Sequence, residues 1–285
     1  MKDIIIRSGE VLAHVNAFGA ELKGLSMNGF EYLYDGDPRY YGRTSPTLFP
    51  IIGRFLSDTY FDGDQWYQMP LNGIAQNRNF AVAAQGEDFV TFVLTDDEET
   101  RSMYPYHFRL EVTYQVRDGQ LHVDYCVTNT GETGLLPFGL GCHTAYRWPL
   151  TEDEAPEDCF IRFEKKEDIG SFNPFGWKDP IFVSDGFRPL EHDLFRNFTR
   201  SIYGLKSEWV EFASRKHSHS VRIHRSEFPY LAIWASPDEN AKVICIEPCT
   251  SIQAGACLGM FDRSGVQVLQ PGEQCRKRFA IEPRQ

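Results

Sequence analysis

The 285-residue sequence has no apolar run long enough to span a membrane. A transmembrane helix needs about 20 consecutive apolar residues, whereas the run nearest the N-terminus, Ile4-Ile5-Ile6, is ended by Arg7. That run is also far too short for the apolar part of a secretory signal peptide. We therefore expect a soluble protein with no signal peptide and no membrane anchor.

Basic residues and paired cysteines are also scarce. The chain has 29 Lys and Arg against 40 Asp and Glu, a net charge of -11. This balance disfavours nucleic acid and anionic membranes as partners, because both require basic patches. The seven cysteines form no Cys-x-x-Cys pair, and Cys126, Cys142 and Cys245 lie among apolar residues. Such thiols are typical of a reducing compartment, so we expect a cytoplasmic location.

Helical periodicity is almost absent, and short alternating segments take its place. The clearest unit covers residues 108–116, turns at Arg117-Asp118-Gly119-Gln120, and returns over residues 121–127. Apolar residues alternate in both arms around the Asp-Gly turn, which predicts a β-hairpin. Polar residues occupy the other face of the first arm, so one side of this pair is expected to face solvent.

The rest of the chain follows the same pattern of short strands and turns. The turn Gln270-Pro271-Gly272-Glu273 is expected to close a final hairpin, and residues 151–158 and 170–185 are expected to be long surface loops. Many short strands joined by Gly- and Pro-rich turns are typical of an all-β sandwich, here as a single domain over residues 1–285. Further strands are predicted at residues 11–15, 20–25, 89–94, 160–163, 209–212, 221–224, 230–235, 266–269 and 278–281.

A glutamate and a histidine stand out among apolar residues. Glu247 follows the run Val243-Ile244-Cys245-Ile246, which is typical of a buried strand. Pro248 is expected to stop the strand there and to leave Glu247 at its end. Burial raises the pKa of a carboxyl group, which makes a glutamate a useful base near neutral pH. The best candidate for an acid partner is His143, which lies between small and apolar residues.

Plainer interpretations of these residues stay open. Glu247 pairs with a nearby arginine in one of them, and His143 is a hydrogen-bonded core histidine in the other. The histidines at 217, 219 and 224 lie in or near the polar turn at residues 215–220. Because the sequence around them supplies no complete ligand set, no metal site is expected.

Four blocks of sequence resemble a known family. The chain is similar to the aldose 1-epimerases, or galactose mutarotase-like proteins, and in particular to the shorter bacterial branch typified by the LacX proteins. The most specific block, residues 42–54, matches the pattern GRxxPxLFPixGR. The four blocks are Gly19-Ala20-Glu21-Leu22 with Glu31-Tyr32-Leu33-Tyr34, Gly42-Arg43-Thr44-Ser45-Pro46-Thr47-Leu48-Phe49-Pro50-Ile51-Ile52-Gly53-Arg54, Gly141-Cys142-His143-Thr144-Ala145-Tyr146, and Tyr230-Leu231-Ala232-Ile233-Trp234 with Cys245-Ile246-Glu247-Pro248.

The resemblance implies a fold and a set of site residues. The implied fold is a supersandwich of antiparallel strands with a sugar cleft on its concave face. A catalytic Glu/His pair is implied, and it falls on Glu247 and His143. Arg54 is implied to bind the sugar, because its guanidinium can donate two directed hydrogen bonds to adjacent hydroxyls. A structural ion pair is the alternative for Arg54 and the expected role of Arg43.

The chain also departs from the family pattern. Asn72 stands where the family usually has a second active-site histidine, and Gln76 stands where it has an arginine. An amide donates and accepts hydrogen bonds but carries no proton at physiological pH, so Asn72 is expected to orient the sugar without charge. Thr144 replaces a proline and Cys249 an aromatic residue, and the segment Phe195-Arg196-Asn197-Phe198-Thr199 lacks an aspartate often found there.

The activity implied is mutarotation, the exchange of α and β anomers of a hexose through the open-chain aldehyde. A proton is removed from the C1 hydroxyl and another is delivered to the ring oxygen. Glu247 is assigned as base and His143 as acid, which predicts a protonated His143 when Glu247 is ionised. No cofactor and no metal are required, because the only chemistry is proton transfer. A small-molecule sugar is the expected partner, and a monomer or homodimer is the expected assembly.

Three alternatives stay open. A sugar-binding protein of the same fold without catalysis would account for Asn72, Gln76 and Cys249, although it leaves the retention of Glu247 and His143 unexplained. A phosphosugar (hexose-6-phosphate) 1-epimerase would need a cluster of basic residues at the cleft, and Gln76 removes one of them. A non-enzymatic structural sandwich gives the Glu/His pair no role.

Overall fold

The computed structural model describes residues 3–167, 169–172, 178–182, 187–195, 199–253, 255 and 257–285. Nearly all regular structure in these residues is antiparallel β-sheet, which confirms the all-β prediction. The α-helix α1 (Glu98–Met103) is six residues long, and among the described residues no helix is long and apolar enough to cross a membrane. The 3₁₀ turns are η1 (Leu56–Asp58), η2 (Ala75–Asn77), η3 (Pro156–Asp158), η4 (His192–Phe195) and η5 (Met260–Asp262).

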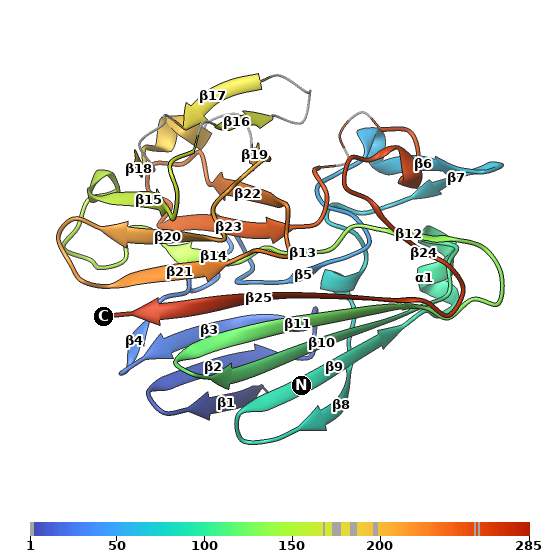
Figure 1. Ribbon diagram of the computed structural model, residues 1–285, viewed down its shortest axis with the longest axis horizontal. Helices are drawn as coiled ribbons and strands as arrows, with labels where there is room; N and C mark the ends of the chain where they lie inside the picture. The colour runs from blue at the N-terminus through green and yellow to red at the C-terminus, as the bar shows by residue number, and fades with distance from the viewer. Residues whose placement is uncertain are drawn as a thin grey trace.

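A nine-stranded sheet forms one layer of the described fold (Figure 1). Its strand order is β18 (Phe187–Pro189), β15 (Cys159–Phe163), β20 (Trp209–Ser214), β21 (Ser220–His224), β25 (Gln274–Arg284), β11 (Gln120–Asn129), β10 (Phe108–Arg117), β9 (Phe89–Thr95) and β8 (Ala81–Gln85). The long strands β10 and β11 are half-buried, with inward and outward residues alternating along most of their length.

The predicted hairpin at β10 and β11 is confirmed. Arg117 pairs with Gln120 across the turn, and Asp118 and Gly119 both have positive φ angles, 53° and 74°. Two consecutive residues of positive φ are the requirement of the tight turn that matches strand twist, and an Asp-Gly pair satisfies it at low cost.

An eight-stranded sheet forms the second layer and carries the residues of interest. Figure 1 shows its strands β22 and β23 lying above β25 and β11 in the view. Its strand order is β17 (Lys178–Phe182), β16 (Ile169–Phe172), β19 (Arg200–Ile202), β22 (Tyr230–Ala235), β23 (Val243–Cys249), β13 (Gly141–Cys142) and β5 (Thr47–Leu48), with β14 (Ala145–Arg147) also paired to β23.

Three smaller sheets complete the described fold. A four-stranded sheet joins β1 (Ile4–Ser8), β2 (Val11–Asn16), β3 (Glu21–Met27) and β4 (Phe30–Glu31). Two-stranded pairs are formed by β12 (Leu136–Phe138) with β24 (Gln267–Leu269), and by β6 (Thr59–Asp62) with β7 (Gln65–Gln68). In Figure 1 the β6–β7 pair lies beside one end of the eight-stranded sheet.

Apolar side chains of both large sheets meet in one buried cluster. Val112 of β10, Val123 of β11 and Ile246 of β23 all belong to it. Successive side chains of a strand point to opposite faces, so one face of β23 is committed to this core. The other face is free to build a site.

Two predictions about connections are wrong. The turn at residues 270–273 is present, with the Glu273 amide donating to the Gln270 carbonyl at 3.0 Å, but the strands it joins do not pair with each other. β24 pairs with β12, whereas β25 lies between β11 and β21. Within residues 170–185, predicted as a surface loop, the described parts include β17 and most of β16, and residues 173–177 and 183–185 lie outside the described chain. The residues of β16 and β17 do not alternate between apolar and polar, which is the pattern by which a sequence indicates a strand.

Candidate active site

Glu247 lies on the face of β23 that points away from the main core. It pairs with Ala232 of β22 and shares its face with Cys245 and Cys249. Those two cysteines belong to small apolar clusters of their own, separate from the main core. The carboxyl group is buried, and its Oε1 has no hydrogen-bond partner among the described residues. A buried oxygen that makes no hydrogen bond is costly. Apart from the contact with His143 described below, this oxygen is placed to accept a hydrogen bond from a group outside the chain.

Pro248 does not end the strand, contrary to the prediction. β23 continues to Cys249, and Pro248 pairs with Leu231 of β22. The amides of Ile246 and Thr250, two residues to either side, donate to the carbonyls of Thr144 and Leu140. The register places position 248 opposite Cys142, the last residue of β13, between these two hydrogen bonds. Proline therefore leaves one donor out of this ladder at the point where β13 ends, and Glu247 lies inside the strand rather than at its end.

His143 occupies that interruption and faces Glu247. Its amide donates to the Pro46 carbonyl at 3.1 Å, which fixes the backbone between β13 and β14. Its Nε2 lies 3.4 Å from Oε1 of Glu247. The two residues, predicted to face one cleft although far apart in the sequence, are thus brought together.

Two aromatic rings enclose the imidazole, and sequence analysis singled out neither for the site. The Tyr41 ring stacks on His143 with centroids 4.8 Å apart and planes inclined by 21°. Trp234 presents its ring edge-on to His143 at 6.0 Å and contacts Tyr41 at 5.5 Å. The alternation of β22 is the signal for Trp234, because it places this residue on the same face as Ala232 and hence as Glu247. Tyr41 lies in an irregular segment and carries no such signal.

Burial drives both members of the pair toward their neutral forms. Loss of solvation raises the pKa of Glu247 to about 8 and lowers the pKa of His143 to about 4, because a water-poor site disfavours charge. Both shifts favour a pair in which the carboxyl group, rather than the imidazole, carries the proton. The expectation that His143 is protonated when Glu247 is ionised concerns the reacting pair and stays a prediction.

The pair lies in a cleft of about 960 Å³. Aromatic residues gather at the His143 side, and loop residues form the remainder of the wall. The described lining residues are Tyr40, Tyr41, Arg43, Ile52, Gly53, Arg54, Phe55, Leu56, Ser57, Leu71, Asn72, Gln76, Asn77, His143, Thr199, Trp234, Glu247, Gln253 and Gly255.

Arg54 and Asn72, the two residues expected to bind the sugar, both line this cleft. The Arg54 side chain is 56% exposed and pairs with Asp58, with Nη1 and Oδ2 3.1 Å apart. Exposed ion pairs contribute little to stability, so the guanidinium can exchange this partner for a sugar hydroxyl.

Asn72 has a structural contact that the sequence did not reveal. Its side-chain Oδ1 accepts a hydrogen bond from the Gly53 backbone N–H, and its backbone N–H donates to the Gly53 carbonyl, both at 2.7 Å. The residue has a φ of 59°, a conformation that asparagine adopts more readily than most side chains. No hydrogen bond of its Nδ2 is found among the described residues, which leaves that donor for a ligand.

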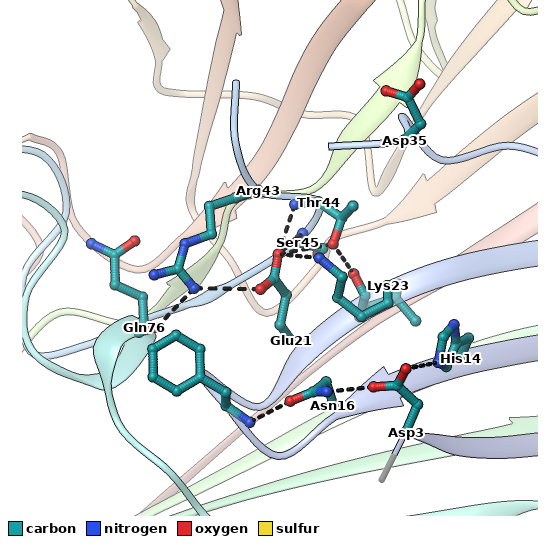
Figure 2. Close-up of polar contacts among 12 residues, drawn as sticks. Asp3, His14, Asn16, Glu21, Lys23, Asp35, Arg43, Thr44, Ser45 and Gln76 are labelled. Atoms are coloured by element: carbon teal, nitrogen blue, oxygen red, sulfur yellow. Dashed lines mark hydrogen bonds and ion pairs between the residues drawn. The ribbon is translucent and has the colours of Figure 1, made fainter. Parts of the chain in front are cut away.

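Figure 2 shows how a buried carboxylate holds the segment beside the site. Oε1 of Glu21, on β3, accepts from the Thr44 amide at 2.7 Å and from the Thr44 hydroxyl at 2.8 Å. Its Oε2 pairs with Nη1 of Arg43 at 3.4 Å, the structural ion pair expected of that arginine. The Thr44 carbonyl in turn accepts from the Ala145 amide at 2.7 Å. Glu21 therefore holds Thr44, and the segment of Thr44 accepts hydrogen bonds from the amides of Ala145 and, through Pro46, of His143.

The other departures from the family pattern have visible consequences. The Thr144 hydroxyl lies 2.8 Å from the Ser45 hydroxyl, a contact that proline would not make. Cys249 packs in a small apolar cluster beside the cleft. Gln76 lines the cleft and donates to the Leu71 carbonyl. In the segment lacking the aspartate, residues 196–198 lie outside the described chain, and Thr199 lines the cleft.

All seven cysteines are free thiols. Among the residues that the structure describes, no three His, Cys, Asp or Glu side chains are arranged to hold a metal ion.

Comparison with known proteins extends these observations. The family model described as aldose 1-epimerase matches residues 2–282. The chromosomal LacX protein of Lactococcus lactis subsp. lactis is 27% identical over 296 aligned residues, which cover 98% of each chain.

Two solved structures are similar over nearly the whole chain. A galactose mutarotase-like protein from Lactobacillus casei ATCC 334 has a TM-score of 0.92 at 29% identity and covers 99% of this chain and 100% of its own. A galactose mutarotase related enzyme from Lactobacillus acidophilus has a TM-score of 0.91 at 25% identity, with coverage of 99% and 97%. The match of the family model over residues 2–282, together with the galactose mutarotase-like fold, shows that the chain belongs to the aldose 1-epimerase family.

Proposed function

We propose that the protein is an aldose 1-epimerase, an isomerase that interconverts the α and β anomers of a reducing sugar. The observation that supports this most strongly is the Glu247–His143 contact of 3.4 Å within a cleft. A proton acceptor and a proton donor that close can serve the C1 hydroxyl and the ring oxygen of one pyranose, which are bonded to the same carbon.

The reaction requires only that protons move. Glu247 takes the proton of the C1 hydroxyl while His143 gives a proton to the ring oxygen, and the bond between C1 and the ring oxygen breaks to give the aldehyde. After rotation about the C1–C2 bond, the ring oxygen attacks the other face of C1, and both protons return. Each positioned group typically contributes about 10²–10⁴-fold to the rate.

The pair must carry one proton in total for this exchange. In the empty site that proton is on Glu247, because burial raises the pKa of this residue to about 8 and lowers that of His143 to about 4. A sugar hydroxyl that donates to Oε1, which makes no hydrogen bond among the described residues and lies 3.4 Å from His143 Nε2, stabilises the carboxylate. The proton then moves to Nε2 of His143, so that Glu247 becomes the base and His143 the acid.

The remaining site residues orient the sugar in this proposal. Arg54 donates from its exposed guanidinium, and Asn72 donates from Nδ2 while its Oδ1 stays bound to Gly53. The seven free thiols favour the reducing environment of the cytoplasm as the place of action.

A phosphosugar substrate is less well matched to the cleft. Of the lining residues in the described part of the chain, the cationic side chains are Arg43 and Arg54, and each already pairs with a carboxylate, Glu21 and Asp58. Arg54 can exchange Asp58 for a ligand, but Arg43 is held by the buried Glu21, so these residues do not provide the cluster of basic side chains that a phosphate group needs.

Exchange between the anomers of a panel of aldoses, measured by saturation-transfer NMR, tests the proposal against the binding-protein alternative. We expect transfer between the α and β C1 proton signals well above the rate in buffer. If sugars bind but exchange no faster than in buffer, the protein is a sugar-binding module, and the proposed activity is wrong.

A further inference from the structure

The side chain of His143 lacks the hydrogen bond that commonly fixes the orientation of a histidine in proton transfer. In many such sites the ring nitrogen that does not react donates to a carboxylate or a backbone carbonyl. Here Nδ1 is buried and has no hydrogen-bond partner among the described residues. The backbone N–H of His143 is fixed by the Pro46 carbonyl, but rotation of a histidine ring about χ2 is intrinsically soft. Another contact must therefore hold Nε2 toward Glu247.

The ring of Tyr41 makes such a contact. It stacks on the imidazole with centroids 4.8 Å apart and planes inclined by 21°. Trp234 contacts both rings, with its centroid 5.5 Å from that of Tyr41 and 6.0 Å from that of His143. Rotation about χ2 would move an edge of the imidazole into the Tyr41 ring, so a close-packed stack resists this rotation.

Tyr41 is itself held in place, although its segment has no regular structure. Its backbone N–H donates to the Asp37 carbonyl at 3.0 Å, and the Tyr34 hydroxyl donates to the same carbonyl at 2.9 Å. Its ring packs against the small buried cluster that contains Ala145 and Cys245. These two residues lie on β14 and β23, two positions along the chain from His143 and Glu247. The Tyr41 ring is therefore fixed to the same two segments that carry the pair.

We propose that Tyr41 is a positioning residue for His143, which holds Nε2 toward Glu247 by stacking in place of a hydrogen bond to Nδ1. The flat ring carries this role, and the Tyr41 hydroxyl is not needed for it. Tyr41 lies outside the four blocks of family resemblance. The inference rests on the proposed mutarotase function and adds to it a residue that acts through His143.

Two substitutions separate a flat ring from a simple apolar cover. Tyr41→Phe keeps the ring, whereas Tyr41→Met keeps an apolar side chain of adaptable shape over the imidazole. Saturation-transfer NMR on D-glucose and D-galactose gives kcat and KM of anomeric exchange. We expect Tyr41→Phe to keep kcat within about twofold of the wild type and Tyr41→Met to lower kcat by roughly tenfold or more, because a misplacement of about 1 Å can cost on the order of 10²-fold. The loss should fall on kcat more than on KM, and the low-pH limb of kcat/KM should not move, since the imidazole stays covered.

The matched control is Tyr67→Met, because Tyr67 stacks on Tyr60 with centroids 5.6 Å apart and planes inclined by 25° but does not line the cleft. It removes a stacked ring of the same kind and should keep the wild-type kcat. Wild-type kcat in Tyr41→Met, or an equal loss in Tyr41→Phe, overturns the inference and leaves the mutarotase function intact. A low-pH limb that rises toward about 6.5 in Tyr41→Met also overturns it, because the ring would then act by excluding water. No exchange of either sugar by the wild type overturns the mutarotase function itself.

Discussion

At the scale of single residues, the pKa values of the Glu247–His143 pair depend on the exclusion of water from the site. Desolvation by burial is the main cause of both pKa shifts, and it acts on the two groups in opposite directions. One proton therefore stays on the pair across a wide range of pH. The aromatic rings of Tyr41 and Trp234 help to exclude water from His143.

The pH dependence of kcat/KM follows from this single proton. Below about pH 4 both groups are protonated and no base is left, and above about pH 8 neither is protonated and no acid is left. We expect a bell-shaped profile with limbs near these two values, which belong to the pair as a unit. The measurement is enzymatic anomeric exchange from pH 3.5 to 9, corrected for exchange in buffer; an acid limb at about 6.5, the ordinary value for histidine, would contradict a buried His143.

Asn72 combines two roles that substitutions can separate. Asn72→Asp keeps the oxygen that accepts from Gly53 and removes the Nδ2 donor. We expect it to raise KM by about three- to tenfold, the usual effect of losing one hydrogen bond to a sugar hydroxyl, with little change in the thermal unfolding midpoint. Asn72→Ala removes both groups at a positive φ and should also lower that midpoint. Wild-type KM in both variants would show that Asn72 does not contact the sugar.

At the scale of elements, the interruption between β13 and β14 creates the site. It frees His143 from the ladder and places it opposite Glu247 in the register. Glu21 supports the interruption from β3 through Thr44, whose carbonyl accepts from Ala145. We therefore expect Glu21, a residue outside the cleft, to help position the imidazole.

Glu21→Gln tests this support. The amide cannot serve both the Thr44 donors and Arg43, so we expect a loss of about 2 kcal/mol or more in unfolding free energy. Looser packing around His143 should admit water and move the acid limb of the pH profile upward, toward the ordinary histidine value.

The control for Glu21→Gln is Glu31→Gln. This carboxylate accepts from the amides of Leu25 and Leu33, and no hydrogen bond of it to residues 43–46 is found in the described chain. It should lower stability without shifting the acid limb. The same limb in the wild type and both variants would mean that Glu21 stabilises the fold but does not position His143.

Elements defined by local pattern were predictable from the sequence, and those defined by distant pairing were not. The β10–β11 hairpin shows its alternation and its Asp-Gly turn within a short segment, and its register follows. β13 and β5 are two residues each, too short to show a local pattern. They form because β13 pairs with β23 on one side and with β5 on the other. The turn at residues 270–273 was recognisable, but which strands pair across it depends on the whole sheet.

The features of the site also divide into those that the sequence predicts and those that depend on distant pairing. Glu247 and His143 were identifiable from their apolar surroundings and from the family resemblance. Their distance of 3.4 Å depends on an interruption in a distant strand, which no local pattern records. Tyr41 reaches His143 from an irregular segment, and Asn72 binds Gly53 through a positive φ, so neither contact was visible in the sequence.

At the scale of the whole molecule, a buried carboxyl group makes stability depend on pH. Between about pH 4.5, the ordinary value for glutamate, and about pH 8, the folded protein keeps a proton on Glu247 that the unfolded chain releases. Raising the pH through this window therefore lowers the contribution of Glu247 to stability. Burial of a neutral His143 acts in the opposite sense below about pH 6.5, so the net loss from the pair is expected between about pH 6.5 and pH 8. The burial that raises the pKa of Glu247 for proton transfer therefore also lowers the contribution of this residue to the stability of the fold as the pH rises.

Glu247→Gln removes that dependence, because an amide does not titrate. We expect its thermal unfolding midpoint to exceed that of the wild type by an amount that grows from pH 5 to pH 8, equivalent to on the order of a few kcal/mol at the upper end. Glu132→Gln, at an exposed glutamate, is the control and should show no such growth. A constant difference between Glu247→Gln and wild type across this range would show that Glu247 is solvated.

The central claim is that the Glu247–His143 pair moves the protons of anomer exchange, and the exchange rate of Glu247→Gln tests it most directly. The amide nearly preserves the shape of the site but cannot accept the C1 hydroxyl proton. Saturation-transfer NMR should show exchange reduced by at least about 10²-fold, while titration of the same sample shows that sugar still binds. Exchange near the wild-type rate in a folded, sugar-binding Glu247→Gln protein would contradict the account.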